Sequence, residues 1–401
     1  MMTPNNTGHF EPAQNTFNQG WIHAKKYLYL TSLVLPALPI ASAAAAHLTG
    51  NGLWFWIFVV GFYFVLPPLD HLLGEDPANP SGDTEEQLRN ERYYVRIMYL
   101  ATALHWLAVF AMAAVVGLGD WPWYHVVGAA LSLGLASGLA LVAGHELGHK
   151  INDRKQMFAA KMILACSGYG HFTIEHNKGH HKDVATPDDP ASSRFGESIY
   201  RFVLREIPGA AKRAWKLESQ RLKRQGKAVW SLDNEILQPA MVTAVAYSAL
   251  IAAFGAVMIP FLLIASAYAW WQLTCANYVE HYGLLRRKNA EGRFERCQPC
   301  HSWNSNRKAS NLILLHLQRH SDHHARPTVP YQILRDYGDV PTLPSGYPFM
   351  FLLAMLPPLW FLVMNPRVVA AVEGDQERIN LAPHKPASYL QRHLRTAQAS
   401  A

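Results

Sequence analysis

Long apolar runs alternate along this chain with short segments rich in charged residues. Six runs are each close to the roughly 20 residues that an α-helix needs to cross a bilayer. Five of them contain no Asp, Glu, Lys or Arg, and the third contains only Arg96. The pattern predicts an all-α integral membrane protein with six transmembrane helices in a single membrane-embedded domain spanning 1–401. The predicted spans cover about residues 27–48, 53–69, 94–118, 126–144, 239–257 and 259–278.

The loops between these runs differ in charge. The connections after the first and third runs and the turn between the last two contain no Lys or Arg, whereas Lys25 and Lys26 precede the first run. Positive residues favour the cytoplasmic side. The sequence therefore predicts that both termini and the soluble segments 145–238 and 279–345 are cytoplasmic. We expect no cleaved signal peptide, because the polar N-terminus lacks a basic region followed by a short apolar run.

An apolar segment at 347–364 is interrupted by Pro348, Pro357 and Pro358. A straight seventh span there would place the basic C-terminus outside. We therefore expect a broken helix that lies in, or dips into, the inner leaflet.

Composition adds little beyond this picture. Half of the residues are hydrophobic and 16% are charged, as expected for membrane helices with a polar portion. The net charge of +7 fits the positive-inside bias, or alternatively a docking face for an acidic partner. Nucleic acid is not an expected partner, because the basic residues form no stripe with interleaved aromatics. Four cysteines are too few and too scattered for a disulfide framework.

Histidines gather in three clusters, and a further histidine follows the sixth run. Neutral imidazole is the commonest protein ligand for transition metals. Residues four apart share a helix face, so we expect His145 with His149 and His176 with His180 to point together. Adjacent histidines diverge by about 100° on a helix and reach two ions more naturally than one. Nine imidazoles suit two ions with four or five ligands each. The candidate ligands are His145, His149, His176, His180, His181, His281, His320, His323 and His324.

Acidic residues next to these histidines are candidates to accept a proton from the ligand rings, which would fix ring orientation. One of them could instead bridge the two ions, and ordinary surface charge is the alternative for each. His316 lies one helical turn before His320 and is a further candidate to contact a ligand. The set comprises Glu146, Glu175, Asp183, Glu280, Asp322 and His316.

Four segments resemble the motifs of bacterial alkane 1-monooxygenases: His145-Glu-Leu-Gly-His-Lys150, Glu175-His-Asn-Lys-Gly-His-His181, Asn277-Tyr-Val-Glu-His-Tyr-Gly-Leu284 and Leu317-Gln-Arg-His-Ser-Asp-His-His324. The resemblance covers nearly the whole chain. It implies a non-haem diiron enzyme of the bacterial inner membrane that hydroxylates medium-chain n-alkanes at the terminal carbon with O2. It also implies rubredoxin as the electron donor, reduced by an NADH-dependent rubredoxin reductase. The chain contains no Gly-x-Gly-x-x-Gly dinucleotide motif of its own.

The resemblance further implies a narrow apolar tunnel with a gating aromatic residue on the second span. Phe62 matches that position best, and Phe55 and Phe58 share its helix face. Packing or lipid contact is the alternative for these phenylalanines. For rubredoxin docking, the expectation is a basic inner surface around Arg286, Arg287, Lys288 and Arg293. Cys297 and Cys300 form a lone Cys-x2-Cys pair beside His301, which is too little for a built-in rubredoxin.

Three other functions remain open from the residues alone. A fatty acid desaturase or another lipid hydroxylase would use the same histidines. An intramembrane zinc protease would use His145-Glu-x2-His149 with Glu146 as the base and leave seven histidines without a role. A metal transporter would place ligands within the spans, whereas these lie at the predicted cytoplasmic ends.

Overall fold

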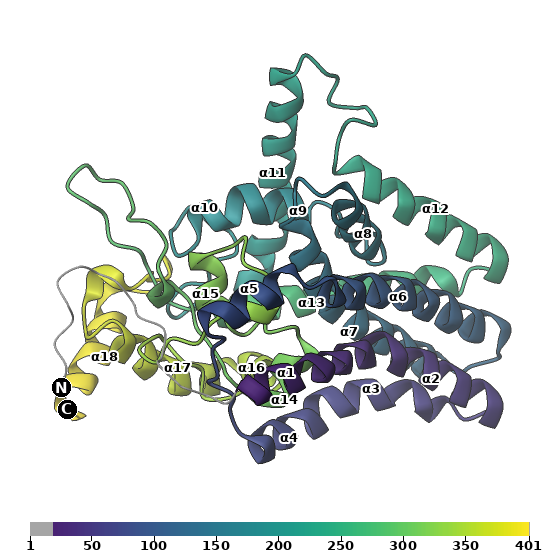
Figure 1. Cartoon of the computed structure of the whole chain (residues 1–401), viewed down its shortest axis with the longest axis horizontal. Helices are drawn as coiled ribbons and strands as arrows, with labels where there is room; N and C mark the ends of the chain where they lie inside the picture. Colours follow the sequence, from purple (N-terminus) through teal and green to yellow (C-terminus); the bar gives the residue numbers. More distant parts are fainter. Residues whose placement is uncertain (1–18, 401) are drawn as a thin grey trace.

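The computed structural model describes residues 19–400, and its helices form one bundle with a polar cap at one end (Figure 1). Within these residues, extended backbone pairing is limited to five isolated bridges, so the predicted all-α fold is confirmed.

Six helical spans are long and apolar enough to cross a membrane, which confirms the six predicted from the sequence. The fifth ends three residues earlier than expected, because Gly255 adopts a left-handed φ of 81° and terminates the helix. The first two spans contain short 3₁₀ or π segments. The elements are α1 (Gln19–Leu28), η1 (Tyr29–Leu33) and α2 (Val34–Thr49); η2 (Gly52–Trp56), α3 (Ile57–Val60), η3 (Gly61–Val65) and α4 (Leu66–Leu73); α6 (Arg92–Leu118); α7 (Trp123–Gly148); α12 (Leu237–Phe254); and α13 (Met258–His281).

Helix α7 is the central helix of the bundle. Its apolar window is 89% buried, against 11–44% for the other spans. Gly134 and Gly138 allow α13 to approach closely, because a Cβ at either position would lie within 3 Å of an α13 backbone oxygen. The two helices pack side by side and end at the polar cap, which brings His145 and His281 to the same end of the bundle.

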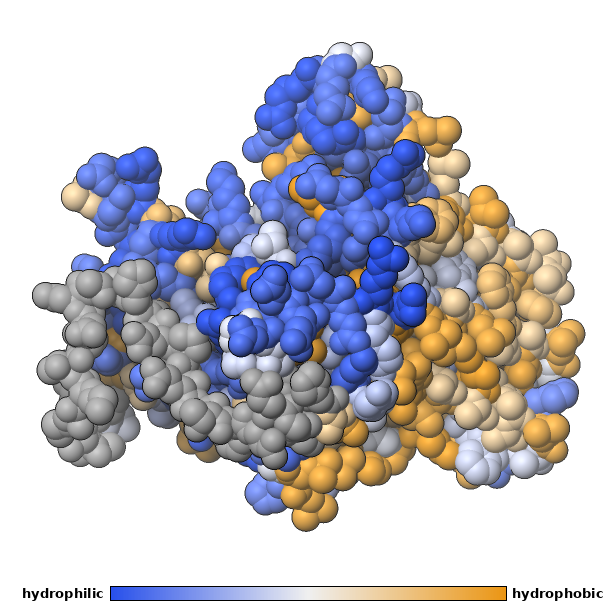
Figure 2. Space-filling view, viewed as in Figure 1, coloured by the Kyte–Doolittle hydropathy of each residue, from blue (hydrophilic) through white to orange (hydrophobic). Residues whose placement is uncertain are grey.

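The polar cap consists of the segments 149–236 and 282–346 together with α5. Figure 2 shows hydrophilic residues over α5, α10 and α11 and hydrophobic residues over the opposite end of the bundle. This separation is typical of a protein that is partly embedded in a membrane. The cap elements are α5 (Gly82–Asn90), α8 (Arg154–Ala165), α9 (Phe172–Glu175), η4 (His176–His180), α10 (His181–Asp183), α11 (Ile199–Arg224), η5 (Pro299–His301), α14 (Lys308–Ile313), α15 (His320–Ala325) and η6 (Tyr331–Ile333).

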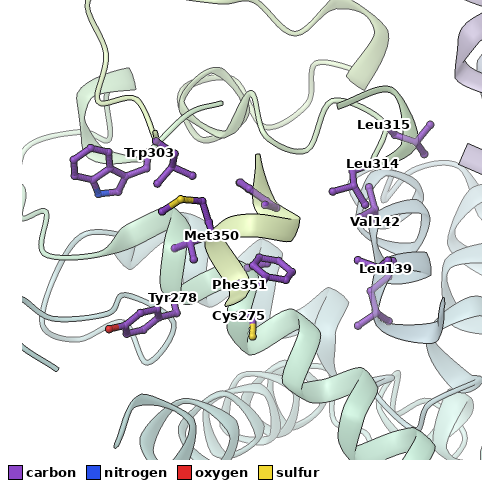
Figure 3. Close-up of a cluster of buried hydrophobic side chains, with 14 of the residues drawn as sticks. Leu139, Val142, Cys275, Tyr278, Trp303, Leu314, Leu315, Met350 and Phe351 are labelled. Carbon is purple, nitrogen blue, oxygen red and sulfur yellow. The ribbon is translucent and has the colours of Figure 1, made fainter. Parts of the chain in front are cut away.

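The C-terminal apolar segment forms two helices, α16 (Tyr347–Ala354) and α17 (Pro357–Ala371), with an angle of 119° between them. The break falls directly before Pro357, where a helix is expected to stop. Helix α16 is buried within the protein rather than laid over its surface. In Figure 3, Phe351 lies between Cys275 of α13 and Leu139 of α7, and Met350 lies on the side of Trp303 and Tyr278. The chain continues through η7 (Gln376–Arg378) and ends with α18 (Ala387–Ser400).

Candidate metal centre

All nine candidate ligands converge at the junction between the bundle and the polar cap. They form two groups, and within each group the ligand atoms lie within 4.8 Å of one another. We call these the five-histidine group and the four-histidine group. The five-histidine group contains His145, His149, His176, His181 and His323, and the four-histidine group contains His180, His281, His320 and His324.

The membrane helices α7 and α13 each contribute to a different group. His145 and His149 lie one turn apart at the end of α7, and their Nε2 atoms are 3.2 Å apart. The last residue of α13, His281, has its Nε2 atom 3.2 Å from that of His320. The α7–α13 packing therefore sets the position of one group relative to the other.

The segment His176–His180 is a π-helix, and this changes the pairing expected from an α-helix. Residues five apart share a face in a π-helix, because its hydrogen bonds join residues i and i+5. His176 accordingly pairs with His181, with 2.9 Å between their Nε2 atoms, and His180 belongs to the other group. The expected pairing of His176 with His180 is wrong, whereas the expected divergence of adjacent His180 and His181 is found.

Helix α15 contributes to both groups. His320 and His324 share a face, with Nε2 atoms 2.8 Å apart. The intervening His323 points to the other group, where its Nε2 atom is 2.9 Å from that of His145 and 3.1 Å from that of His181. Two adjacent pairs, His180–His181 and His323–His324, therefore each connect the two groups.

The donor set fits transition-metal ions. Two nitrogens bound at right angles at about 2.1 Å from one ion lie about 3.0 Å apart, which matches the observed Nε2 separations of 2.8–3.2 Å. Burial, and then the neighbouring imidazoles, hold the pKa values of His176, His323 and His324 well below the usual range. These three rings are therefore neutral, which is the form that binds metals.

Two carboxylates stand behind ligand rings. Glu146 places Oε1 3.3 Å from Nδ1 of His145, and its other oxygen accepts the backbone N–H of Tyr331. Asp189 has Oδ2 2.8 Å from Nδ1 of His180. Sequence reasoning missed Asp189, although it lies in the acidic, proline-containing end of the same histidine-rich stretch. Such contacts fix the tautomer and orientation of a ligand ring.

Four other predicted partners contact groups other than the ligand rings. Glu175 and Asp183 both accept from Arg213. Asp322 is buried and accepts from Arg326 and Tyr337. His316 contacts the hydroxyl of Tyr29, with 3.1 Å between Nε2 and the oxygen. These residues stabilise the surrounding loops, so their predicted contact with a ligand is not found in the described chain.

Glu280 occupies a different place from the one expected. Its Oε2 lies 3.3 Å from Nε2 of His320, the atom that faces the other ligand nitrogens. Its Oε1 accepts a hydrogen bond of 2.8 Å from the hydroxyl of Tyr347. The carboxylate therefore faces the inside of the four-histidine group rather than the back of a ring, as a metal-binding carboxylate would.

An apolar cavity ends at the histidines. Figure 3 shows three of its lining side chains, Leu139, Leu314 and Phe351, which come from α7, the residue after α14, and α16. Polar side chains enter only at a few positions, including Gln272 of α13. The cavity is lined by Gly138, Leu139, Leu141, Val142, His145, Phe172, His176, Gln272, Leu273, Ala276, Asn277, Glu280, Leu314, Leu317, His320, Tyr347 and Phe351.

The three predicted substrate-binding phenylalanines are buried, and none of them lines this cavity. Phe62 packs against the cavity residue Phe351, with 6.4 Å between ring centroids. Phe58 lies in the same apolar core. Phe55 belongs to the second core and packs edge-on against Trp121. Of the three, Phe62 is the one whose ring reaches a residue that lines the cavity.

The basic residues predicted for partner docking differ in accessibility. Arg286 is buried and donates to the backbone oxygens of Lys182 and Glu295, so it is not available to a partner. Arg287 is exposed and pairs with Asp375, whereas Lys288 and Arg293 lie exposed on a hairpin.

The Cys-x2-Cys pair lies apart from the nine histidines. Cys297 and Cys300 are free, half-buried thiols, and neither belongs to the two histidine groups. Their neighbour His301 is buried, with Nε2 3.3 Å from Oε1 of Glu295.

Comparisons with known proteins agree with this architecture. Residues 121–354 match the fatty acid desaturase family model. The chain is 52% identical to the alkane 1-monooxygenase of Pseudomonas putida over 93% of this chain and 92% of that protein. It is 51% identical to alkane 1-monooxygenase 1 of Alcanivorax borkumensis, with the same coverage, and 40% identical to the alkane 1-monooxygenase of Acinetobacter baylyi over 92% of this chain and 91% of that protein. The chain therefore belongs to the alkane 1-monooxygenase family of oxidoreductases and carries the fatty acid desaturase domain.

Proposed function

We propose that this protein hydroxylates medium-chain n-alkanes at the terminal carbon, using O2, two iron ions and two electrons from rubredoxin. One observation carries the proposal: an apolar cavity ends directly at two groups of histidines. Three candidate ligands also line the cavity: His145 and His176 of the five-histidine group and His320 of the four-histidine group. An unfunctionalised chain in this cavity would end beside the metals.

The cavity explains how the chain end is selected. A primary C–H bond is stronger than a secondary one, so bond strength alone would favour the inner carbons of the alkane. An alkane offers no hydrogen-bonding group, so shape must hold it. Leu139, Leu273 and Phe351 exclude water and hold the chain with its terminus toward the histidines. The two irons, when bound by the nine histidines, supply the activation of O2.

The alternatives account for less of the structure. A zinc protease based on His145 and His149 needs Glu146 as a base beside the ion, but this carboxylate lies at Nδ1 of His145 and accepts from the backbone N–H of Tyr331. A transporter needs ligands within the spans, whereas these gather at one end of them. A desaturase would use the same centre, and its alkene product distinguishes it from a hydroxylase.

The test is turnover of octane by the membrane-embedded protein with rubredoxin, rubredoxin reductase and NADH. We expect 1-octanol and close to two iron ions per chain by elemental analysis. Octene as the product would replace the proposal with desaturation. One zinc ion per chain and no oxidised product would contradict it altogether.

We place the polar cap on the cytoplasmic side of the inner membrane, together with the described C-terminal helix. The N-terminal end lies outside the described residues. The support is the distribution of Lys and Arg, which concentrate in the cap and are absent from the loops at the other end. Soluble rubredoxin would then reach the cap directly.

The docking face that we propose surrounds the two least buried ligands, His149 and His181. Lys150 and Lys182 follow them directly in the chain, and Lys182 is exposed. The hairpin with Lys288 and Arg293 adjoins this face, because Arg286 binds the backbone oxygen of Lys182. Electrons entering at His181 would reach the five-histidine group over the shortest path.

Charge reversal tests this docking face. We expect Lys182→Glu to raise the KM for rubredoxin on the order of tenfold at low salt, because rubredoxins are typically acidic and like charges repel. The difference should shrink as ionic strength rises. Arg293→Glu is the matched comparison on the hairpin. A larger effect of Arg293→Glu would move the docking site to the hairpin, and salt-independent turnover in both variants would exclude electrostatic docking.

A further inference from the structure

A second, small cavity adjoins the apolar one, and Phe172, His176, Leu273 and Asn277 line both. Its lining is polar where the first is apolar. Besides His176 it includes the ligand His180 and four other titratable side chains, Tyr169, His171, Glu175 and Glu206. The metal ligands therefore contact an apolar space and a polar space that are distinct. The polar space has no part in holding an alkane.

Glu206, on α11, is the unusual group in this polar cavity. Its side chain is 1% exposed, and within the described chain its carboxyl accepts hydrogen bonds only from the hydroxyl of Thr274, at 2.8 Å, and the amide of Asn277, at 3.2 Å. Both partners are neutral. By contrast, Glu175 on the same cavity wall is paired with Arg213. A buried carboxyl without a cationic partner is costly to ionise and is common at functional sites.

The surroundings of Glu206 make it an acid that changes protonation near neutral pH. Burial, and then the nearby charges of Glu175 and Asp189, raise its pKa to about 7, against the hydrogen bonds from Thr274 and Asn277. The ligand His180 on the same wall is paired through its Nδ1 with Asp189. Arg213 is engaged by Glu175 and Asp189, and burial lowers the pKa of His171 to about 4, so that this ring is neutral.

The reaction needs such an acid. Hydroxylation follows RH + O2 + 2e⁻ + 2H⁺ → ROH + H2O, so two protons must reach the centre in each turnover while the donor supplies the two electrons. An alkane that fills the apolar cavity leaves no room there for water to deliver them. The polar cavity touches the ligands His176 and His180 and offers a water several polar partners.

We propose that Glu206 supplies protons to the metal centre through this polar cavity and is reprotonated by way of His171. His171 suits the second role because its residue is half-buried while its Nε2 is buried without a hydrogen-bond partner. The neutral ring can take a proton on one nitrogen and release one from the other. This inference rests on the proposed hydroxylation, since that reaction consumes the protons.

Glu206→Gln is the decisive variant, because it keeps the shape, with one oxygen that can accept from Asn277 and an amide N–H that can donate to the hydroxyl of Thr274, but cannot release a proton. We expect kcat to fall about 100-fold, within the range for loss of a positioned acid. The KM for octane and the iron content should stay as in the wild type. The amount of NADH consumed per octanol formed should rise, because the electrons not used for hydroxylation reduce O2 to hydrogen peroxide. The wild-type kcat should fall as pH rises through about 7, where Glu206 loses its proton, and the variant should lack this limb.

Glu218→Gln serves as the control, because Glu218 is a buried carboxylate on the same helix that pairs with Arg221 away from both cavities. It should retain the wild-type kcat and pH profile. If Glu206→Gln does not accumulate in the membrane, Glu206→Asp decides the matter. That variant keeps an acid but withdraws it by one methylene, so a lowered kcat with a shifted limb supports the proposal.

Infrared titration of the holoenzyme measures the protonation of Glu206 without turnover. The carbonyl stretch of a protonated carboxylic acid should disappear near neutral pH in the wild type and be missing from Glu206→Gln. Absence of octane hydroxylation by the wild type would refute the proposed function, while the titration would still report on Glu206. Normal hydroxylation by a Glu206→Gln or Glu206→Asp variant with the wild-type kcat and pH profile would overturn the inference.

Discussion

Replacement of His324 by alanine should remove the metal of the four-histidine group and reduce alkane hydroxylation by more than about 100-fold. Loss of a residue that only contacts a metal ligand typically costs roughly 10- to 100-fold in activity, and loss of a direct ligand should cost more. The Nε2 atom of His324 lies 2.8 Å from that of His320 and 3.2 Å from that of His180, so its loss leaves three imidazoles around this ion. Iron per chain and octanol formation are the two measurements.

His316 provides the matched control from the same stretch of chain. It is buried like His324, but it contacts Tyr29 instead of the other histidines. Its φ is 56°, so asparagine, which tolerates this conformation, is the suitable substitution. His316→Asn should lower stability and keep both metals. Full iron content and turnover in His324→Ala would remove this residue from the ligand set.

The six spans could be predicted from the sequence because hydrophobic length is a local signal that any bilayer imposes. The burial of α16 could not be predicted, because it depends on contacts with α13 and η3, which are distant in the sequence. The same limit applied to Phe55 and Phe62. A shared helix face was visible from the spacing, but the 3₁₀ and π segments of that span send the two rings to different cores.

The nine histidines were recognisable because spacing and residue type together indicate metal binding. Their division into five and four depends on the π-helix at His176–His180, and Gly179 was the only local feature that pointed to it. The roles of Asp189 and Glu280 follow only from the three-dimensional structure, in which Asp189 lies behind His180 and Glu280 lies beside Nε2 of His320. Glu206 could not be recognised from the sequence, because its partners Thr274 and Asn277 are 68 and 71 residues away, on a membrane helix.

The apolar cavity leads to the other large expected effect. Ala276 on α13 lines this cavity and is buried, so Ala276→Phe would place a ring in the space that Leu139, Leu314 and Phe351 also border. We expect octane hydroxylation to fall about 10- to 100-fold, equivalent to the roughly 1–3 kcal/mol cost of overfilling a packed apolar space. Shorter alkanes should lose less, because their carbons need less of the cavity. Product formation across a series of chain lengths measures this shift.

The same substitution at Ala267 distinguishes an effect on the cavity from an effect on the lipid-facing surface. Ala267 lies on the same helix but is exposed, so Ala267→Phe adds the same ring to a face of α13 that is open to lipid. It should keep the wild-type preference for chain length, and both variants should keep their iron because neither replaces a candidate ligand. An Ala276→Phe enzyme with an unchanged preference would mean that the alkane reaches the histidines by another route. Loss of long chains alone, with iron retained, requires the chain to lie between α7, α13 and α16, because the added ring alters only that space.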